Sequence, residues 1–215
     1  MSITLHGFAV SNYSTKVKLA LLEKGVAFTE TDTRTGSKEE AVLSASPLGK
    51  IPFMLTEQGP LCESQAMLDY IEARYPQPPL LPADAYAAAK VRELTTFIDW
   101  HLEIVARQLY GAAFFGGAAL SDARRDAVRK QLTDNIVAFK RLAKFSPFVA
   151  GDSFSQADCA AFNNLPLVGM ASKAIYGEDL LLTGGVDYKG YVKMIGERPS
   201  AVKVIADRKA ATVKP

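Results

Sequence analysis

The sequence has little cysteine and little histidine, and both shortages limit the chemistry that its own side chains can perform. Among 215 residues the only cysteines are Cys62 and Cys159, and the only histidines are His6 and His101. Because the two cysteines lie far apart in the sequence, neither a disulfide framework nor a Cys-x-x-Cys redox site is expected. Metal chemistry is also not expected, since zinc sites draw mainly on clustered cysteine and histidine.

The sequence also lacks long apolar runs and an excess of either charge. No apolar run approaches the roughly 20 residues that a membrane-spanning helix needs, and the N-terminus shows no basic-then-apolar signal. The 25 basic and 23 acidic residues are interleaved and give a formal net charge of +2. Nucleic-acid-binding domains carry a clustered basic surface instead. We therefore expect a cytoplasmic globular protein that binds neither membranes nor nucleic acid.

The first 78 residues switch repeatedly between strand-like and helix-like patterns. Residues 3–6 and 26–31 have strand patterns on either side of a helix that stops at Gly25. A strand, a short helix and a strand form a βαβ unit, so these two strands should be parallel. Short strands at 53–55 and 61–62 should form a hairpin, followed by a helix over 65–75. This order resembles the thioredoxin fold and predicts an α/β domain with a mixed four-stranded sheet.

The second half of the chain is predicted to be entirely helical. Four prolines within residues 76–82 stop the preceding helix, and residues 79–87 are interpreted as a linker. Beyond this linker, apolar residues recur at the three- and four-residue spacing of long amphipathic helices. We expect residues 88–215 to form an all-α helical bundle. The apolar residues that mark two of its helices are Val91, Leu94, Ile98, Leu102, Val105 and Leu109, and then Val128, Leu132, Ile136, Phe139 and Leu142.

A capping box is predicted at Ser155 to Asp158. The Ser155 side chain can accept a hydrogen bond from the Asp158 N–H, and the Asp158 carboxylate can accept one from the Ser155 N–H. Residues 159–168 are almost wholly apolar, which is typical of a helix buried on all sides. We expect the motif to be structural and its helix to be central.

Residues 46–66 contain the first pattern that suggests a ligand. Ile51 must be extended because Pro52 follows it, and if that bond is cis, the Ile51 main chain can pair with a peptide-like ligand as an added strand does. The helix starting at Glu63 and Ser64 offers N–H groups and a positive dipole end that suit a carboxylate. Glu63 itself can hold an ammonium group. The alternative is an ordinary strand-entry proline and an ordinary helix cap.

The loop after the first strand, residues 8–15, is the second place where chemistry is expected, because α/β units present ligand groups there. Ser11 is our candidate residue in this loop. The residues alone favour another interpretation, in which Ser11 and Ser14 are alternative caps of the following helix. No histidine base is evident that would make serine a nucleophile.

Both segments resemble the cytosolic glutathione S-transferase family. Its serine-using members, of the phi, theta and zeta kinds, carry the pattern Ser-x-x-Ser/Thr-x-Arg/Lys-Val, and residues 11–17 here read Ser-Asn-Tyr-Ser-Thr-Lys-Val. The Ile51-Pro52 and Glu63-Ser64 pairs are similar to the family's glutathione-binding segment. The capping box at Ser155 is similar to that of the family's C-terminal domain.

The resemblance implies a glutathione transferase that acts as a homodimer in detoxification, with glutathione as co-substrate and no metal. Ser11, with Asn12 as a possible helper, would stabilise the thiolate that attacks the electrophile. The residues assigned to glutathione are Lys38 and Lys50 for the glycyl carboxylate, Ile51 and Pro52 for the cysteinyl main chain, and Glu63 and Ser64 for the γ-glutamyl end. The residues assigned to a hydrophobic electrophile, mostly from the C-terminal domain, are Phe8, Trp100, Tyr110 and Phe114.

Some residues depart from the patterns of other classes in the family. Phe8 stands where the tyrosine-using members carry their working tyrosine, and the Ser11 loop has no cysteine. Zeta-type isomerases usually show Ser-Ser-Cys-Ser, whereas Asn12 and Tyr13 form the middle pair here. Two alternatives stay open: a glutathione-dependent isomerase or peroxidase, and a non-catalytic binding protein with the same fold.

Overall fold

The computed structural model describes residues 3–212, which divide into two compact units. One unit contains the chain up to Leu80 together with the residues from Gly196 onward, and the other runs from Leu81 to Ile195. The predicted division placed residues 79–87 in a linker and 88–215 in the helical domain. The structure differs at both points, because a helix already begins at Ala85 and the last helix groups with the N-terminal unit.

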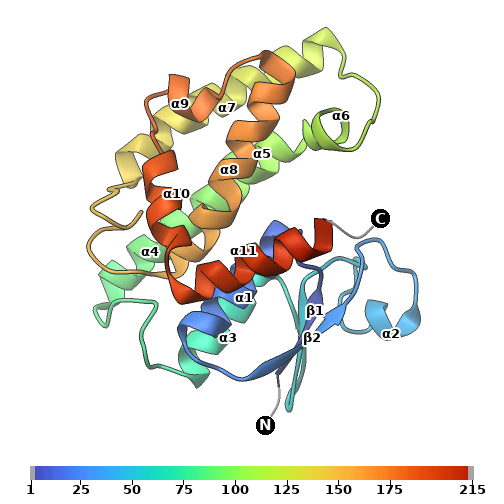
Figure 1. Ribbon diagram of the computed structural model, residues 1–215, viewed down its shortest axis with the longest axis vertical. Coiled ribbons are helices and arrows are strands. Elements are labelled where there is room, and N and C mark those ends of the chain that lie inside the picture. Colours follow the sequence, from blue (N-terminus) through green and yellow to red (C-terminus); the bar gives the residue numbers. More distant parts are fainter. Residues whose placement is uncertain (1–2, 213–215) are drawn as a thin grey trace. The chain divides into compact units, whose positions relative to one another are not determined.

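The first unit is built on a mixed four-stranded sheet, which confirms the predicted thioredoxin-like α/β fold (Figure 1). Its strands are β1 (Ile3–Gly7), β2 (Phe28–Asp32), β3 (Phe53–Thr56) and β4 (Gly59–Cys62), in the order β2-β1-β3-β4. β1 and β2 are parallel, as a βαβ unit requires, while β3 is antiparallel to both β1 and β4.

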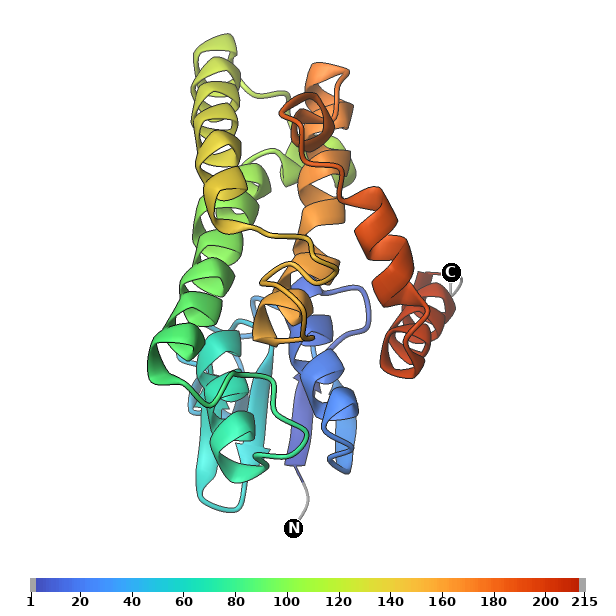
Figure 2. The same cartoon turned by 90° about the vertical axis from the view of Figure 1, so that its left-hand side faces the viewer.

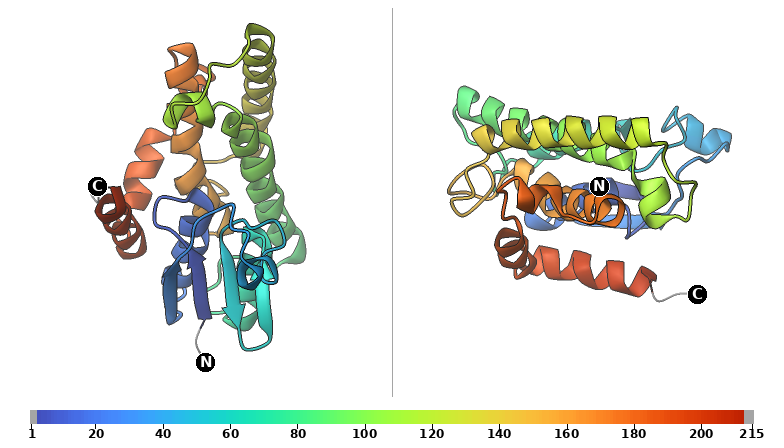
Figure 3. Two further views of the ribbon diagram at one scale, coloured as in Figure 1. Left: turned by 90° about the vertical axis from the view of Figure 1, so that its right-hand side faces the viewer. Right: turned by 90° about the horizontal axis from the view of Figure 1, so that it is seen from above.

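The helices of this unit are α1 (Asn12–Glu23), α2 (Glu40–Leu43), α3 (Ser64–Arg74) and α11 (Pro199–Thr212). Helices α1 and α3 contact the sheet, whereas α11 packs on α1 and α2 has no buried residue. Figure 2 shows α1 and α3 in front of the strands, and the left view of Figure 3 shows the strands from the opposite side. Val17 and Leu21 of α1, Met67 and Ile71 of α3, and Met54 of β3 are fully buried in this core.

The second unit is all-helical, as predicted. Its helices are α4 (Ala85–Phe97), the π-helical segment η1 (Ile98–Glu103), α5 (Ile104–Arg107), α6 (Tyr110–Phe114), α7 (Asp122–Leu142), α8 (Gln156–Tyr176), α9 (Leu180–Thr183) and α10 (Lys189–Gly196). Within residues 81–195, all of which the structure describes, the one β interaction is an isolated bridge between Phe148 and Gly151. In the part of the chain covered by residues 3–212, no helix has the length and apolar character to cross a membrane.

The long helix predicted over residues 91–109 is continuous but not uniform. It consists of α4, η1 and α5, and the predicted apolar residues Leu94, Ile98 and Leu102 are all buried. The π-helical segment turns two acidic side chains, Asp99 and Glu103, into the interior. The Asp99 carboxylate accepts a hydrogen bond of 2.8 Å from Asn164 of α8, and Glu103 forms an ion pair of 2.5 Å with Arg107.

The capping box at the start of α8 is confirmed, and α8 is the central buried helix of this unit. Asp158 is fully buried and accepts four hydrogen bonds of 2.8 to 3.0 Å, from the Ser155 N–H and hydroxyl, the Val149 N–H and the Tyr191 hydroxyl. Burial raises the pKa of this carboxyl, and the hydrogen bonds oppose that rise. The motif therefore connects three segments of the chain as well as capping one helix.

We predict that Asp158→Ala strongly destabilises the protein, because it leaves buried donors on Ser155, Val149 and Tyr191 without an acceptor. The expected loss in the free energy of unfolding is roughly 3 to 5 kcal/mol. Chemical denaturation of the two proteins measures it. The control is Asp152→Ala, six residues earlier and exposed, which should change stability by less than about 0.5 kcal/mol. Equal losses in both variants would contradict this role for Asp158.

Candidate functional site

The register of the sheet brings three predicted site segments to one edge. His6 of β1 pairs with Phe53 of β3, and Phe53 pairs with Cys62 of β4. Because β3 is antiparallel to both neighbours, β1 and β4 end on the side where β3 begins. The loop after β1, the Ile51-Pro52 pair before β3 and the Glu63-Ser64 pair after β4 therefore share this edge of the sheet.

Gly7, the last residue of β1, lets these segments approach closely. A Cβ atom on Gly7 would lie 2.2 Å from the Ser14 Oγ and 3.9 Å from the Pro52 Cβ. Only a residue without a side chain allows the first turn of α1 to lie this close to the strand. Gly7 thus permits the close approach of α1 to β1, while its distance to Pro52 is that of an ordinary contact.

Ser11 is the N-cap of α1. Its backbone is extended, and its side-chain oxygen accepts a hydrogen bond of 3.3 Å from the Ser14 N–H. Its own N–H donates to the Phe8 carbonyl at 3.0 Å, which closes the loop between β1 and α1. The cap therefore belongs to Ser11, while the buried Ser14 hydroxyl has no hydrogen-bond partner among the described residues. Asn12, the first residue of α1, is also buried.

The Ile51-Pro52 peptide bond is cis, the condition that the sequence argument named. Pro52 is buried beside Gly7, and Ile51 is half-buried. Within residues 3–212, the Ile51 N–H and C=O take part in none of the hydrogen bonds found. The Ile51 main chain therefore has the hydrogen-bonding capacity that an added peptide strand requires.

Glu63 and Ser64 begin α3 with an uncommon backbone conformation. Glu63 is the N-cap and has φ 68° and ψ 114°, in the region that side-chain-bearing residues rarely adopt. Such strain costs on the order of 1–3 kcal/mol and is found preferentially at ligand-binding positions. The exposed Glu63 side chain and the half-buried Ser64 stand at the positive end of the α3 dipole.

Lys16 is a site residue that the sequence analysis quoted in a motif but gave no role. It is completely buried, and its Nζ lies 3.3 Å from the Ser64 Oγ and 3.2 Å from the Gln65 Oε1. A buried ammonium needs such polar partners because an uncompensated charge is costly to desolvate. Lys16 therefore joins α1 to the start of α3 and brings a positive charge to it. The position of Lys16 in the Ser-x-x-Ser-x-Lys-Val pattern was the sequence feature that could have indicated its role.

Lys38 and Lys50 are exposed and lie in two segments that touch each other. The Gly36 N–H donates to the Gly49 carbonyl at 2.7 Å, and the Ser46 hydroxyl donates to the Lys50 carbonyl at 2.8 Å. These bonds fix the main chain around both lysines, although neither ammonium group takes part. The structure thus brings the two segments together and leaves both charges at the surface.

Phe8 lies in the Ser11 loop with a cation over its ring. The Arg34 guanidinium carbon is 4.4 Å from the ring centroid, within the range of a cation–π interaction. Phe8 also lines a cavity of about 10 Å³ with Gly7, Ser14 and Lys18. That volume holds one water molecule at most.

The other three residues predicted for the electrophile lie in the helical unit. Trp100 of η1 is 61% exposed and Phe114 of α6 is 38% exposed, whereas Tyr110 is buried. The rings of Tyr110 and Phe114 are 5.1 Å apart, and the Arg107 guanidinium carbon lies 5.3 Å from the Tyr110 centroid. Burial and the neighbouring Glu103 charge raise the pKa of the Tyr110 hydroxyl, so it remains protonated. Tyr110 and Phe114 thus form one aromatic pair.

The assembled edge suits an anionic, peptide-like ligand. The N-termini of α1 and α3 both open there, buried Lys16 lies between these helices, and the Ile51 main chain provides a donor and an acceptor. Among residues 3–212, no group of three or more His, Cys, Asp or Glu side chains lies close enough to hold a metal ion. The groups at this edge can bind a ligand by hydrogen bonds and by a positive electrostatic potential.

Comparisons with known proteins identify a family. A protein-family model described as the N-terminal domain of glutathione S-transferase matches residues 5–79. A glutathione S-transferase from Pseudomonas putida is 37% identical over 97% of this chain and 94% of its own length. A stringent starvation protein A homolog from Pasteurella multocida is 28% identical over 92% of this chain and 87% of its own length.

A solved structure supports the same fold. It is a crystal structure of a glutathione S-transferase from Methylobacterium radiotolerans in complex with glutathione sulfonate. The structures align with a TM-score of 0.76 and 24% sequence identity, covering 95% of each chain.

We predict that Gly7→Ala destabilises the protein, because the new methyl group overlaps the Ser14 side chain. The expected loss in the free energy of unfolding is about 1–3 kcal/mol, the usual cost of overpacking. Thermal and chemical denaturation measure it. Gly190→Ala in α10 is the control, since a Cβ atom there meets nothing within 4 Å and alanine favours a helix. A Gly7→Ala protein as stable as the parent would contradict the close approach.

Proposed function

The chain belongs to the glutathione S-transferase family, and on this basis we propose that it binds glutathione at the sheet edge and activates its thiol for attack on hydrophobic electrophiles. The Ser11 hydroxyl donates a hydrogen bond to the glutathione sulfur and so favours the thiolate. The bound thiolate, not a protein side chain, is the nucleophile. The catalytic residue is Ser11, and Asn12 beside it assists.

The hydrogen-bonding state of Ser11 is the observation that carries this proposal. Its oxygen accepts from the Ser14 N–H, and no hydrogen bond donated by its hydroxyl is found within residues 3–212. A hydroxyl has one proton to donate. Accepting from the helix N-terminus polarises the hydroxyl, which makes that proton a better donor to an incoming anion.

The energy of one such bond is sufficient for the task. A free thiol has a pKa of about 8.5, and a hydrogen bond to a charged acceptor is worth about 1.5–3 kcal/mol. Since one pKa unit corresponds to about 1.4 kcal/mol, the bond lowers the thiol pKa to roughly 7. Much of the bound glutathione is then thiolate at neutral pH.

The rest of glutathione is assigned to groups along the same edge. The Ile51 main chain beside Pro52 pairs with the cysteinyl residue, as in strand addition. The γ-glutamyl carboxylate binds at the start of α3 near Ser64, and Glu63 holds the γ-glutamyl ammonium. Lys38 and Lys50 bind the glycyl carboxylate from the two segments joined by the Gly36–Gly49 hydrogen bond. This assignment leaves each charged group of the tripeptide with a partner of opposite charge or a helix N-terminus.

The electrophile is proposed to be hydrophobic. Phe8 in the Ser11 loop and Trp100, Tyr110 and Phe114 of the helical unit are the residues assigned to it. Three of these rings are at least partly exposed. Aromatic side chains favour apolar and aromatic acceptors, since they bury large areas of apolar surface.

Homodimerisation remains a prediction from the family resemblance. A measurement of the protein's mass in solution tests it.

We predict that Ser11→Ala raises the pKa of the bound glutathione thiol by about 1–2 units, because it removes the proposed hydrogen bond. The turnover of an aromatic halide at neutral pH should fall by roughly 5- to 50-fold, in step with the fraction of thiolate. Thiolate absorbance of the enzyme–glutathione complex, titrated against pH, measures the first effect. Ser14→Ala is the matched control, since it removes a hydroxyl three residues away and keeps the main-chain N–H.

Other outcomes of the same titration separate the alternatives. If the parent binds glutathione without lowering its thiol pKa, the chain is a non-catalytic binding protein. If the pKa is lowered and only a hydroperoxide or a maleyl ketone is turned over, the chain is a glutathione-dependent peroxidase or isomerase. If Ser11→Ala titrates as the parent does, Ser11 is not the stabilising group.

We predict that Lys16→Met weakens glutathione binding by about 10-fold or more, because Ser64 and Gln65 lose a charged hydrogen-bond donor. Calorimetric titration with glutathione measures the dissociation constant. Lys16→Arg should retain part of the affinity, since it keeps the charge. An exposed lysine of the same unit, Lys209→Met, is the control for the loss of one positive charge. Unchanged affinity in a folded Lys16→Met protein would rule out this role.

A further inference from the structure

Helix α11 and the residue before it, Arg198, are attached to α1 at three points. At the C-terminal end of α1, the Arg198 guanidinium forms two hydrogen bonds of 2.8 and 2.6 Å with the Glu23 carboxylate. The Ser200 hydroxyl also bonds to Glu23. These partners are 175 or more residues apart in the sequence. They are one reason why the last helix groups with the N-terminal unit.

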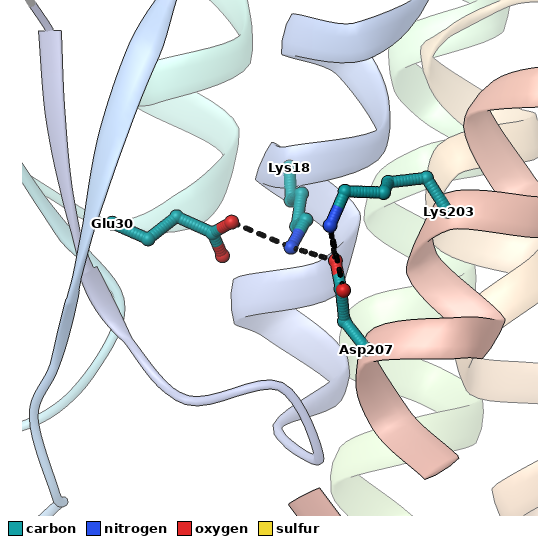
Figure 4. Close-up of polar contacts among 4 residues, drawn as sticks. All are labelled: Lys18, Glu30, Lys203 and Asp207. Carbon is teal, nitrogen blue, oxygen red and sulfur yellow. Dashed lines mark hydrogen bonds and ion pairs between the residues drawn. The ribbon is translucent and has the colours of Figure 1, made fainter. Parts of the chain in front are cut away.

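A second attachment lies in the middle of α1 (Figure 4). The buried Lys18 ammonium is 2.6 Å from the Glu30 carboxylate of β2 and 2.6 Å from the Asp207 carboxylate of α11. Lys203, one turn earlier on α11, also binds Asp207 at 2.6 Å. Although burial raises the pKa of Asp207, the hydrogen bonds from the two lysines hold it below its usual value. The charged Asp207 thus fixes α11 against both α1 and the sheet.

The third attachment reaches the first turn of α1. The Arg208 guanidinium lies 3.4 Å from the Thr15 Oγ1, and Thr15 is almost completely buried. The same oxygen is 2.9 Å from the Ser11 carbonyl oxygen and 3.0 Å from that of Asn12. A hydroxyl has one proton, which Thr15 donates toward these carbonyls while its lone pair accepts from Arg208. One hydroxyl therefore connects the last helix to the Ser11 loop.

We propose that Arg208 is a positioning residue for the thiol-activating loop. Arg208 holds the main chain of Ser11 and Asn12 through Thr15 and adds a positive charge at the N-terminus of α1. This inference rests on the proposed role of Ser11. The guanidinium has a fixed geometry and remains charged, although burial lowers its pKa. Its charge acts in the same direction as the α1 dipole, because both favour an anion at this end of the helix. In this role Arg208 acts on the bound thiol through Thr15 and the electrostatic potential.

If Arg208 has a structural role alone, a different result is expected. If Arg208 only attaches α11, its removal lowers stability and leaves the bound thiol unchanged. If Arg208 positions and polarises the loop, its removal changes the thiol pKa and the pH profile of turnover. The binding of glutathione should change little in that case, because the residues assigned to its charged groups lie on other segments. The two roles are therefore separated by a titration.

The test is the thiolate titration of bound glutathione in the full-length Arg208→Met protein. The thiol pKa should rise by about 0.5–1 unit, and kcat/KM for an aromatic halide at neutral pH should fall by roughly 2- to 5-fold. The KM for glutathione should change less than about twofold. Arg208→Lys should restore part of the effect through its charge. Lys209→Met, the neighbouring exposed cation on α11, is the matched control and should leave all three quantities unchanged.

A second variant keeps the test decisive if Arg208→Met does not fold. Thr15→Val removes the connecting hydroxyl with little change of shape, and Thr15→Ser retains it. Thr15→Val should raise the thiol pKa, and Thr15→Ser should not. A thiol pKa equal to that of the parent in folded Arg208→Met or Thr15→Val, with only a lower melting temperature, would overturn the proposal.

The outcomes also separate this inference from the proposed function. If the parent protein does not lower the thiol pKa of glutathione, the proposed function fails. If Ser11→Ala raises that pKa and neither Arg208→Met nor Thr15→Val does, only the role of Arg208 fails.

Discussion

The pairing register of the β-sheet is the constraint on which the rest of this site depends. The row His6–Phe53–Cys62 places the end of β1, the start of β3 and the end of β4 at one edge. A shift by one residue would turn every side chain of a strand to the other face and separate these ends. The absence of a side chain on Gly7 then lets the first turn of α1 lie close to the end of β1. Positions 11, 51 and 63 become neighbours for this reason.

Helix α1 contributes to the core of the N-terminal unit, to its candidate catalytic loop and to its buried ion pairs. Its apolar side chains fill the core beneath the sheet, its N-cap is Ser11, and its two buried lysines project to opposite partners. Lys16 binds the start of α3, while Lys18 binds β2 and α11. Buried ammonium groups are tolerated only with such partners, so each lysine fixes the element that it contacts. The helix that presents the candidate catalytic hydroxyl is thus held on two sides by charge and from below by packing.

Much of the fold was predictable because its signals are local. Periodicity identified the strands and the buried faces of the long helices, and the Ser155–Asp158 capping box marked the start of α8. The candidate site was predicted in part, since Ser11, the Ile51-Pro52 pair and Glu63 with Ser64 each occur in a short motif. Lys16 and the return of α11 to the first unit were missed. Their partners are 48 or more residues away in the sequence, and no local pattern carries that information.

The sequence by itself determined most of the strands and long helices, the capping box of α8 and the family motifs, because these depend on side chains that are near one another in the sequence. The tertiary structure alone decided which cap α1 uses, that the Ile51-Pro52 bond is cis, and that Lys18 and Arg208 connect the last helix to the first. Burial and charge pairing between distant segments select among alternatives that are locally equivalent. Ser11 and Ser14 were equal candidates as caps until Gly7 and the packing of α1 against β1 placed Ser14 in the interior.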